Sequence, residues 1–96
     1  MAKNRYGIKY CFEYMGGDKY KFVMDDNELN MCRYGGKHLQ EHLDYNDLGM
    51  FDPPGGPYVT VGSTIYWDEI VFNDKVKSIM VHRIYVQDDE IFVEAK

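Results

Sequence analysis

The segment from residue 6 to residue 15 alternates between two kinds of side chain, and this pattern restricts the fold more than any other feature of the chain. A period of two places successive side chains on opposite faces of an extended strand. The apolar face carries Tyr6, Ile8, Tyr10, Phe12 and Tyr14. The pattern predicts a half-buried β-strand with a tyrosine-rich face, and therefore a sheet that buries one of its sides.

Two hairpins are predicted, one near each end of the chain. Residues 16–18 read GGD, which is a turn signal because glycine adopts positive φ at little cost, and residues 19–24 alternate again after it. Near the C-terminus, residues 76–86 and 91–93 are strand candidates on either side of Asp88-Asp89, a second turn signal. Each pair of runs is expected to fold as an antiparallel hairpin.

The only helix that the sequence predicts spans residues 37–48. Leu39 and Leu43 are four residues apart and would share one face of this helix, and Gly49 follows as a C-cap residue. Its apolar stripe is thin, so the helix is expected to lie on the sheet. The preceding residues 29–34 leave two alternatives open, a short strand or an irregular crossing.

The middle of the chain contains a loop and a change of alternation. Residues 51–57 read FDPPGGP, which predicts a rigid, exposed loop that can present an edge to a partner. Beyond it, Ile65 and Trp67 share one face of a strand, whereas the apolar residues after Glu69 have the opposite parity. A bulge or bend is therefore expected at Asp68-Glu69.

Length and composition complete the prediction of the fold. The chain has 96 residues, of which 45% are hydrophobic and 16% aromatic, enough for one core but not for two. About five to six short strands and one short helix are expected at this spacing of turns. We therefore predict a single α+β domain over residues 1–96, mainly an antiparallel sheet or small barrel.

The acidic charge restricts the classes of partner. Eleven Lys and Arg against 16 Asp and Glu give a formal net charge of −5. A general nucleic-acid binder carries a basic face, so no direct nucleic-acid binding is expected, whereas a basic protein partner suits this charge. No apolar run reaches the length of a membrane span, and the N-terminus leads into no signal-peptide core. We expect a cytoplasmic protein without a membrane partner.

Two features could support chemistry, but neither has the context that its chemistry requires. Residues 38–42 read HLQEH, which matches the H-x-x-E-H string of inverted zinc peptidases; on a helix His38 and His42 would share a face and hold one zinc ion. Such enzymes need a further carboxylate from a second helix, so we favour a polar helix face and expect no cofactor. Cys11 and Cys32 lack a nucleophile signature, which predicts buried free thiols and no enzymatic activity.

Tyrosines and acidic clusters are the features that indicate binding. Nine tyrosines exceed the needs of one small core, and tyrosine is enriched at binding surfaces because it offers area and a hydrogen bond at low rotamer cost. The alternative, which stays open, is that a thin sheet uses tyrosine where the ring lies in the core and the hydroxyl reaches solvent. Acidic residues placed side by side can mimic a row of phosphates on a basic partner. The residues predicted to contact a partner are Asp25, Asp26, Glu28, Tyr34, Asp52, Tyr58, Trp67, Asp68 and Glu69.

The run VGSTIYWDEIVFNDKVKSIMVHRIYVQDDEIFVEA, roughly the last third of the chain, resembles small accessory proteins of bacteriophages and mobile elements. The resemblance lies in its strand–turn–strand rhythm and assigns no functional position, because the run contains no diagnostic residue. It implies the role of such proteins, which include inhibitors of host defence and, among these, anti-CRISPR proteins. These inhibitors are typically small, often acidic and non-enzymatic, and they act in the cytoplasm of the host cell.

Three functions follow from these features. The favoured hypothesis is a protein-binding inhibitor that blocks a nucleic-acid-binding partner sterically or electrostatically. The main alternative is a module that binds and sequesters a small ligand or nucleotide through aromatic residues and the proline–glycine loop. The third is a small metal-dependent or cysteine enzyme. A concave aromatic pocket would favour the second hypothesis and a convex acidic face the first, and the sequence leaves a homodimer open.

Overall fold

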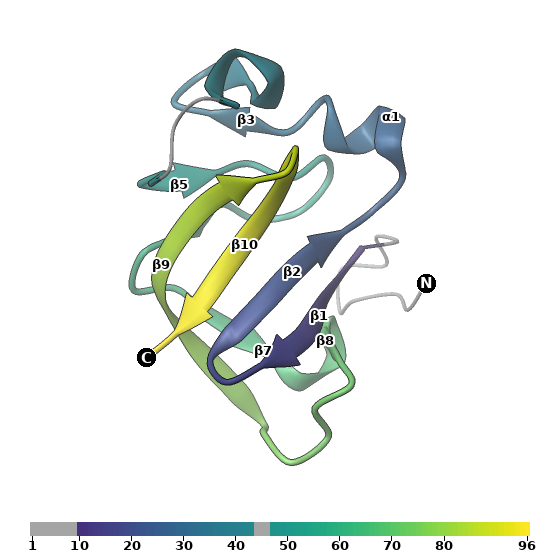
Figure 1. Ribbon diagram of the computed structural model, residues 1–96, viewed down its shortest axis with the longest axis vertical. Helices are drawn as coiled ribbons and strands as arrows, with labels where there is room; N and C mark the ends of the chain where they lie inside the picture. The colour runs from purple at the N-terminus through teal and green to yellow at the C-terminus, as the bar shows by residue number, and fades with distance from the viewer. Residues whose placement is uncertain (1–9, 44–46) are drawn as a thin grey trace.

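The computed structural model describes residues 10–43 and 47–96, and its main element is a six-stranded sheet (Figure 1). Neighbouring strands run antiparallel, except for β1 and β8, which are parallel. The predicted mainly antiparallel sheet is therefore confirmed. In spatial order the strands are β7 (Thr64–Tyr66), β9 (Ser78–Gln87), β10 (Glu90–Ala95), β2 (Lys19–Val23), β1 (Cys11–Gly16) and β8 (Ile70–Val71).

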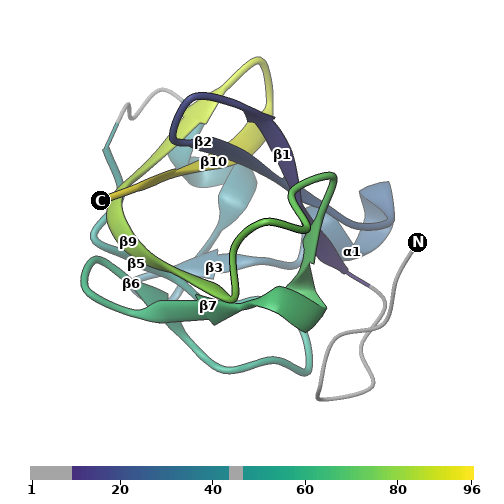
Figure 2. The ribbon, with the colours of Figure 1, turned by 90° about the horizontal axis from the view of Figure 1, so that it is seen from below.

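The sheet curls until its two edges approach each other (Figure 2). The edge strands are β7 and β8, yet only the 3-10 turn η2 (Trp67–Glu69) separates them in the sequence. Such a turn advances about 2 Å per residue, which is far too short to cross a flat sheet whose strands lie about 4.8 Å apart. The connection therefore requires a nearly closed barrel. The predicted bend at Asp68-Glu69 is confirmed, and it is where the chain passes from one edge to the other.

Glu69 supports this closure from the interior. Its side chain is only 5% exposed, and its Oε2 accepts a hydrogen bond from the backbone N–H of Tyr66 at 3.1 Å. The expectation that Ile65 and Trp67 share a face is wrong. Ile65 is buried, whereas Trp67 is 65% exposed, because the strand ends at Tyr66 and Trp67 begins the 3-10 turn.

Both predicted hairpins are confirmed. In the first, Phe12 pairs with Phe22, and a β-bulge lies just before Gly16 at the turn. In the second, Asp88 and Asp89 join β9 to β10 with φ values of 53° and 63°, as a type I′ turn requires. The tyrosine-rich face is buried as expected at Tyr10, Phe12, Tyr20, Phe22 and Met24, whereas Tyr14 on the same face is half-buried. Tyr6 and Ile8 lie outside the described residues.

The long strand β9 changes its buried face halfway along. Ile79 and Val81 are buried in its first half, whereas Ile84 and Val86, of the opposite parity, are buried in its second half. The pairing with β10 shifts register between Glu94 and Ala95, which marks a β-bulge. A bulge rotates the side chains that follow it and bends the strand, so β9 can continue around the barrel.

A second layer of short strands covers one end of the barrel, at the top of Figure 1. β3 pairs with β4 and β5 with β6, all antiparallel. An isolated bridge between Arg33 and Asp52 joins the two hairpins, and another between Leu48 and Ile84 joins this layer to β9. The four strands are β3 (Arg33–Tyr34), β4 (Lys37–His38), β5 (Met50–Phe51) and β6 (Val59–Thr60).

The predicted helix at residues 37–48 is wrong where the structure describes it. Gly35 and Gly36, with φ values of 58° and 86°, form a tight turn that pairs residue 37 with β3, so the segment begins as a strand. Only the 3-10 turn η1 (Leu39–His42) follows, and residues 44–46 lie outside the described residues. Leu39 and His42 are buried three residues apart, a spacing that suits a 3-10 turn better than an α-helix.

A helix does form directly after β2, as the short α1 (Asp26–Leu29). Asp25 caps it, because its Oδ1 accepts the backbone N–H of Asn27 at 2.9 Å. Leu29 packs against the core from the same short helix. Neither α1 nor any other helix in the described part of the chain is long and apolar enough to cross a membrane.

The proline–glycine segment at residues 51–57 is less exposed than predicted. Phe51 is 1% exposed, and Pro53 is among the fully buried side chains. Gly56 lies against Tyr10, close enough that an added Cβ would contact the tyrosine ring. The segment is therefore packed into the core at its start, and it reaches the surface toward Pro57.

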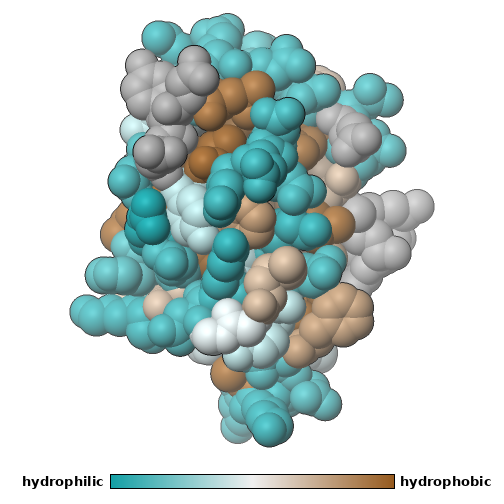
Figure 3. Space-filling model, viewed as in Figure 1, coloured by the Kyte–Doolittle hydropathy of each residue, from teal (hydrophilic) through white to brown (hydrophobic). Residues whose placement is uncertain are grey.

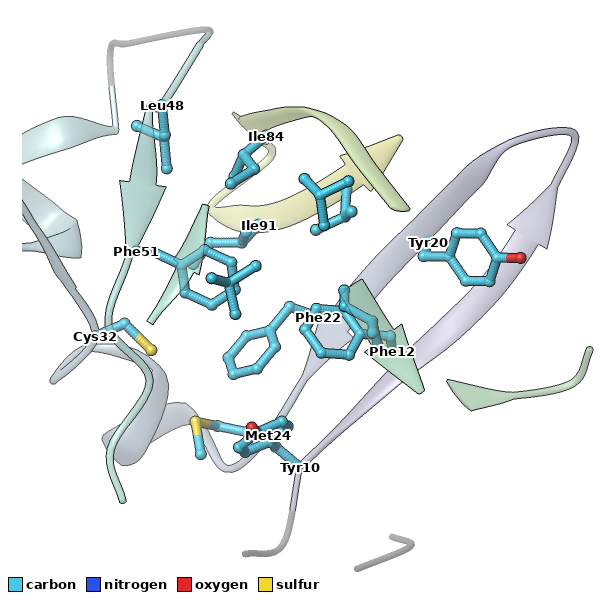
Figure 4. Close-up of a cluster of buried hydrophobic side chains, with 14 of the residues drawn as sticks. Tyr10, Phe12, Tyr20, Phe22, Met24, Cys32, Leu48, Phe51, Ile84 and Ile91 are labelled. Carbon is cyan, nitrogen blue, oxygen red and sulfur yellow. The ribbon is translucent and has the colours of Figure 1, made fainter. Parts of the chain in front are cut away.

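The core lies between the barrel and the second layer (Figure 4). Phe22 is central to it, with ring centroids 5.1 Å from Tyr10, 5.4 Å from Phe12 and 5.1 Å from Phe51. Phe51 belongs to β5, so its contact with Phe22 joins the two layers. Ile91, from β10, packs in the same cluster and is fully buried.

Candidate binding pockets

An aromatic pocket of about 500 Å³ opens where η2, β8 and the loop before β9 meet. Ile70 forms its buried part, whereas Trp67 is 65% and Phe72 78% exposed at its edges. Figure 3 shows apolar patches reaching the surface between polar side chains on the face of the molecule viewed in Figure 1. Its lining residues are Trp67, Ile70, Phe72, Asn73, Asp74, Val76 and Lys77.

Two hydrogen bonds hold the loop that shapes this aromatic pocket. Asn73 Nδ2 donates to Tyr20 Oη at 2.9 Å, and the backbone N–H of Trp67 donates to the carbonyl oxygen of Lys77 at 2.8 Å. Val76 adds packing against the core. The loop is therefore closed at its ends and fixed to β2 near its start.

The backbone of Phe72 is strained. Its φ is 65°, in the left-handed region, which costs a residue other than glycine about 1–2 kcal/mol. The surrounding hydrogen bonds maintain a conformation that leaves a large aromatic side chain in solvent. Strain and exposure of this kind are typical of binding sites.

A smaller pocket of about 270 Å³ lies on the second layer, toward the opposite end of the molecule in Figure 1. It combines a cation, a carboxylate and an aromatic ring, because Arg33, Asp52 and Tyr58 all line it. Arg33 and Tyr58 are exposed, whereas Asp52 is half-buried. Gly35, Gly36 and Met50 complete the lining.

The predicted contact residues lie on four separate segments of the chain, residues 25–28, 34, 52–58 and 67–69. Asp52 and Tyr58 line the smaller pocket and Trp67 lines the aromatic pocket. Asp68 is half-buried, and the carboxylate of Glu69 serves the turn η2 from the interior instead of the surface. The ring of Tyr34 packs edge-on against the buried His42, with centroids 4.7 Å apart, so it supports the second layer.

The remaining predicted residues lie at an acidic end of the sheet. Asp25 and Glu28 are exposed at α1, and the side chain of Asp26 lies outside the described part. β10 pairs antiparallel with β2, so the exposed Asp88-Asp89 turn before β10 lies at the end of the sheet where β2 leads into α1. Within the described part of the chain, no lysine or arginine forms an ion pair with Asp25, Glu28, Asp88 or Asp89.

The geometry proposed for a zinc site is wrong. His38 is exposed at the end of β4, whereas His42 is buried at the end of η1, so the two histidines do not share a helical face. Residues 10–43 and 47–96 contain no group of three or more His, Cys, Asp or Glu side chains that could hold a metal ion.

The two cysteines are buried and free, as predicted. Burial, with a smaller contribution from the nearby carboxylates of Asp52 and Glu28, raises the pKa of the Cys32 thiol to about 12. Burial also raises the pKa of Cys11, with Glu13 adding to the effect. A thiol that stays protonated is a poor nucleophile, so neither cysteine is prepared for covalent catalysis.

Cys32 is expected to resist iodoacetamide at about pH 8 in the native protein and to react readily in denaturant. The free energy of unfolding is expected to fall as pH rises above the ordinary thiol pKa toward 12, because the unfolded thiol loses its proton while the folded one keeps it. Urea unfolding at increasing pH measures this, and Cys32→Ala should flatten the dependence. Equal labelling rates with and without denaturant would contradict the prediction.

Two functional candidates escaped the sequence analysis. The alternation after Glu69 predicts that Phe72 lies on the face of a strand. Only the turn residues Asn73 and Asp74 indicate that the strand ends there. Arg33 was not selected, although it lies beside a Gly-Gly turn that can carry it onto a hairpin. In both cases the informative fact is a long-range pairing, which no local pattern contains.

The fold and its pockets define a small, nearly closed β-barrel protein with a second strand layer, an exposed aromatic pocket and a charged pocket. No protein-family model matches the chain, and no curated protein or solved structure matches it significantly.

Proposed function

We propose that this protein binds another protein and blocks it, with the aromatic pocket as the anchor of the interface. The observation that carries the proposal is the exposure of Trp67 and Phe72 beside a pocket of about 500 Å³. Large aromatic side chains next to a pocket are the usual centres of protein interfaces, where a few residues provide most of the binding energy. The hydrogen bonds of the loop reduce the entropy that these residues lose on binding.

The charge supports a partner with a basic surface. The net charge is −5. Four of the carboxylates are exposed together at the acidic end of the sheet, and they form no ion pairs among the described residues. Two basic side chains of the described residues are compensated, since Arg83 pairs with Asp47 and Glu94, and Lys21 pairs with Glu90. Nucleic-acid-binding proteins carry basic surfaces. We therefore propose that the partner is such a protein in the cytoplasm, and that it is inhibited sterically or electrostatically.

Affinity capture from a host lysate with Trp67→Ala and Phe72→Ala variants tests the proposal. A partner retained by the wild-type protein should lose affinity by roughly thirtyfold or more in the Trp67→Ala variant, as expected for an interface hot spot. Retention should also fall as salt rises, because long-range attraction between exposed charges is screened. Quantitative mass spectrometry of the retained proteins, followed by titration with the purified partner, measures both effects.

Met31→Ala is the matched control, because Met31 is 59% exposed but does not line the aromatic pocket. This variant should retain the partner as the wild type does. The Trp67 and Phe72 variants should keep the melting temperature within a few degrees, since their side chains are exposed. If no protein is retained, or if retention is unaffected by both pocket variants, the proposal is rejected.

A further inference from the structure

The smaller pocket combines a guanidinium, a carboxylate and an aromatic ring in a volume of about 270 Å³. We infer that it binds a nucleoside monophosphate, with the Arg33 guanidinium on the phosphate and the Tyr58 ring against the base. Asp52 then accepts hydrogen bonds from N–H groups on the edge of the base. This inference is independent of the proposed protein partner, because the two pockets share no lining residue.

The pairing of the strands explains why the side chains of Arg33 and Asp52 lie on the same face. Arg33 and Asp52 exchange two backbone hydrogen bonds, from Arg33 N–H to the Asp52 carbonyl at 3.2 Å and from Asp52 N–H to the Arg33 carbonyl at 2.7 Å. Residues directly opposite each other in an antiparallel pair project on the same face. Met50 is two residues before Asp52 and shares that face, whereas Phe51 between them points into the core.

Arg33 is available for a ligand. Among the residues that the structure describes, no carboxylate lies within ion-pair distance of its guanidinium, in contrast to Arg83. The half-buried carboxylate of Asp52 is on the same face without forming an ion pair with it. A guanidinium binds phosphate through paired N–H donors, so an anionic group fits at Arg33. The exposed His38 lies opposite Arg33 in the β3–β4 pair and adds a donor on that face.

Tyr58 supplies the surface for the base. Its side chain is 61% exposed, while Val59 next to it is buried in β6, so the tyrosine is held by a fixed strand. A base stacked on an aromatic ring contributes binding energy whichever base it is, and a carboxylate beside it favours bases that present N–H donors. Guanine presents two such donors on one edge and is the best probe.

The shape of the pocket suits a ligand of this size. Its volume of about 270 Å³ is just below the usual range of ligand pockets, about 300–1,000 Å³, which favours a mononucleotide over a larger cofactor. The Gly35-Gly36 turn forms one wall, and a Cβ at either glycine would meet nothing within 4 Å. The wall therefore leaves space in front of Arg33, where a phosphate can enter.

Titration of the ¹⁵N-labelled protein with guanosine 5′-monophosphate, guanosine and inorganic phosphate tests the inference. The nucleotide should shift the amide signals of Gly35, Gly36 and Tyr58, and guanosine or phosphate alone should bind at least about tenfold more weakly. Arg33→Gln should weaken binding of the nucleotide by about ten- to a hundredfold, because it removes a charge-assisted contact. Tyr58→Ala should weaken it by about fivefold or more through loss of stacking.

Arg83→Gln and Trp67→Ala are the matched controls, because one removes an arginine and the other an aromatic ring outside the pocket. Both should bind the nucleotide as the wild type does. Absence of shifts at millimolar nucleotide would overturn the inference. Equal binding of phosphate and nucleotide, or wild-type affinity in Arg33→Gln, would overturn it as well. The two proposals are tested separately, because Trp67→Ala should lose capture of the protein partner and still bind the nucleotide.

Discussion

Replacing Phe22 with alanine is expected to lower the free energy of unfolding by about 3–5 kcal/mol. Phe22 is 1% exposed, and its ring contacts those of Tyr10, Phe12 and Phe51. Phe51 belongs to the second layer, so the cavity would weaken the barrel and the contact between the layers together. A loss of this size is a large part of the total stability of a small domain, which is about 5–15 kcal/mol.

Urea unfolding monitored by circular dichroism measures this loss. Met31→Ala is the control, because Met31 is 59% exposed and its truncation is expected to change stability by about 0.5 kcal/mol or less. If Phe22→Ala does not fold, Phe22→Leu retains most of the apolar volume and should lose less than half as much stability. Equal unfolding midpoints for Phe22→Leu and Met31→Ala would contradict the central position of this ring.

Gly56→Ala is expected to lower the free energy of unfolding by about 1–3 kcal/mol, although it adds only a methyl group. A Cβ at this position would lie 2.7 Å from Tyr10 Oη, 3.0 Å from Tyr10 Cε2 and 3.2 Å from Pro53 Cγ. Neither neighbour can move easily, because Tyr10 is 1% exposed and Pro53 is fully buried. The methyl group must therefore displace the core or the loop.

Gly49→Ala is the matched control for this substitution. The nearest atom to a Cβ at Gly49 is Tyr34 Oη at 3.7 Å, which is an ordinary van der Waals distance. Stability should stay unchanged or rise by up to about 1 kcal/mol, because alanine restricts the unfolded chain more than glycine does. Thermal unfolding of the two variants compares them, and a Gly56→Ala protein as stable as Gly49→Ala would show that the loop is not closely packed on Tyr10.

The positions of the two pockets allow their functions to be tested separately. The aromatic pocket depends on η2 and the loop before β9, whereas the smaller pocket depends on the bridge between β3 and β5. Trp67 and Arg33 are both exposed, so neither side chain takes part in the packing of the core. Substitution of Trp67 or Arg33 can therefore change binding with little effect on the barrel.

Local patterns in the sequence predicted the hairpins and the bend. Alternation with a period of two identified the buried face that includes Phe12 and Phe22, and turn residues located both hairpin connections. The change of parity at Asp68-Glu69 identified the turn η2. These features depend on neighbours in the chain, so local sequence is sufficient to determine them.

The sequence alone did not predict the second layer or the composition of either pocket. Leu39 and Leu43 matched a helix, but the Gly35-Gly36 turn paired the preceding residues with β3, and that pairing overrode helix propensity. Trp67 was predicted as a contact residue, whereas Phe72 and Arg33 were not. The position of Phe72 depends on the hydrogen bond between its neighbour Asn73 and Tyr20, and that of Arg33 on its bridge to Asp52; both partners are distant in the sequence. The sequence by itself determined the two hairpins and the bend at Asp68-Glu69, and only tertiary pairing decided the second layer and which side chains meet, because register between distant strands is set by the packing of the whole core.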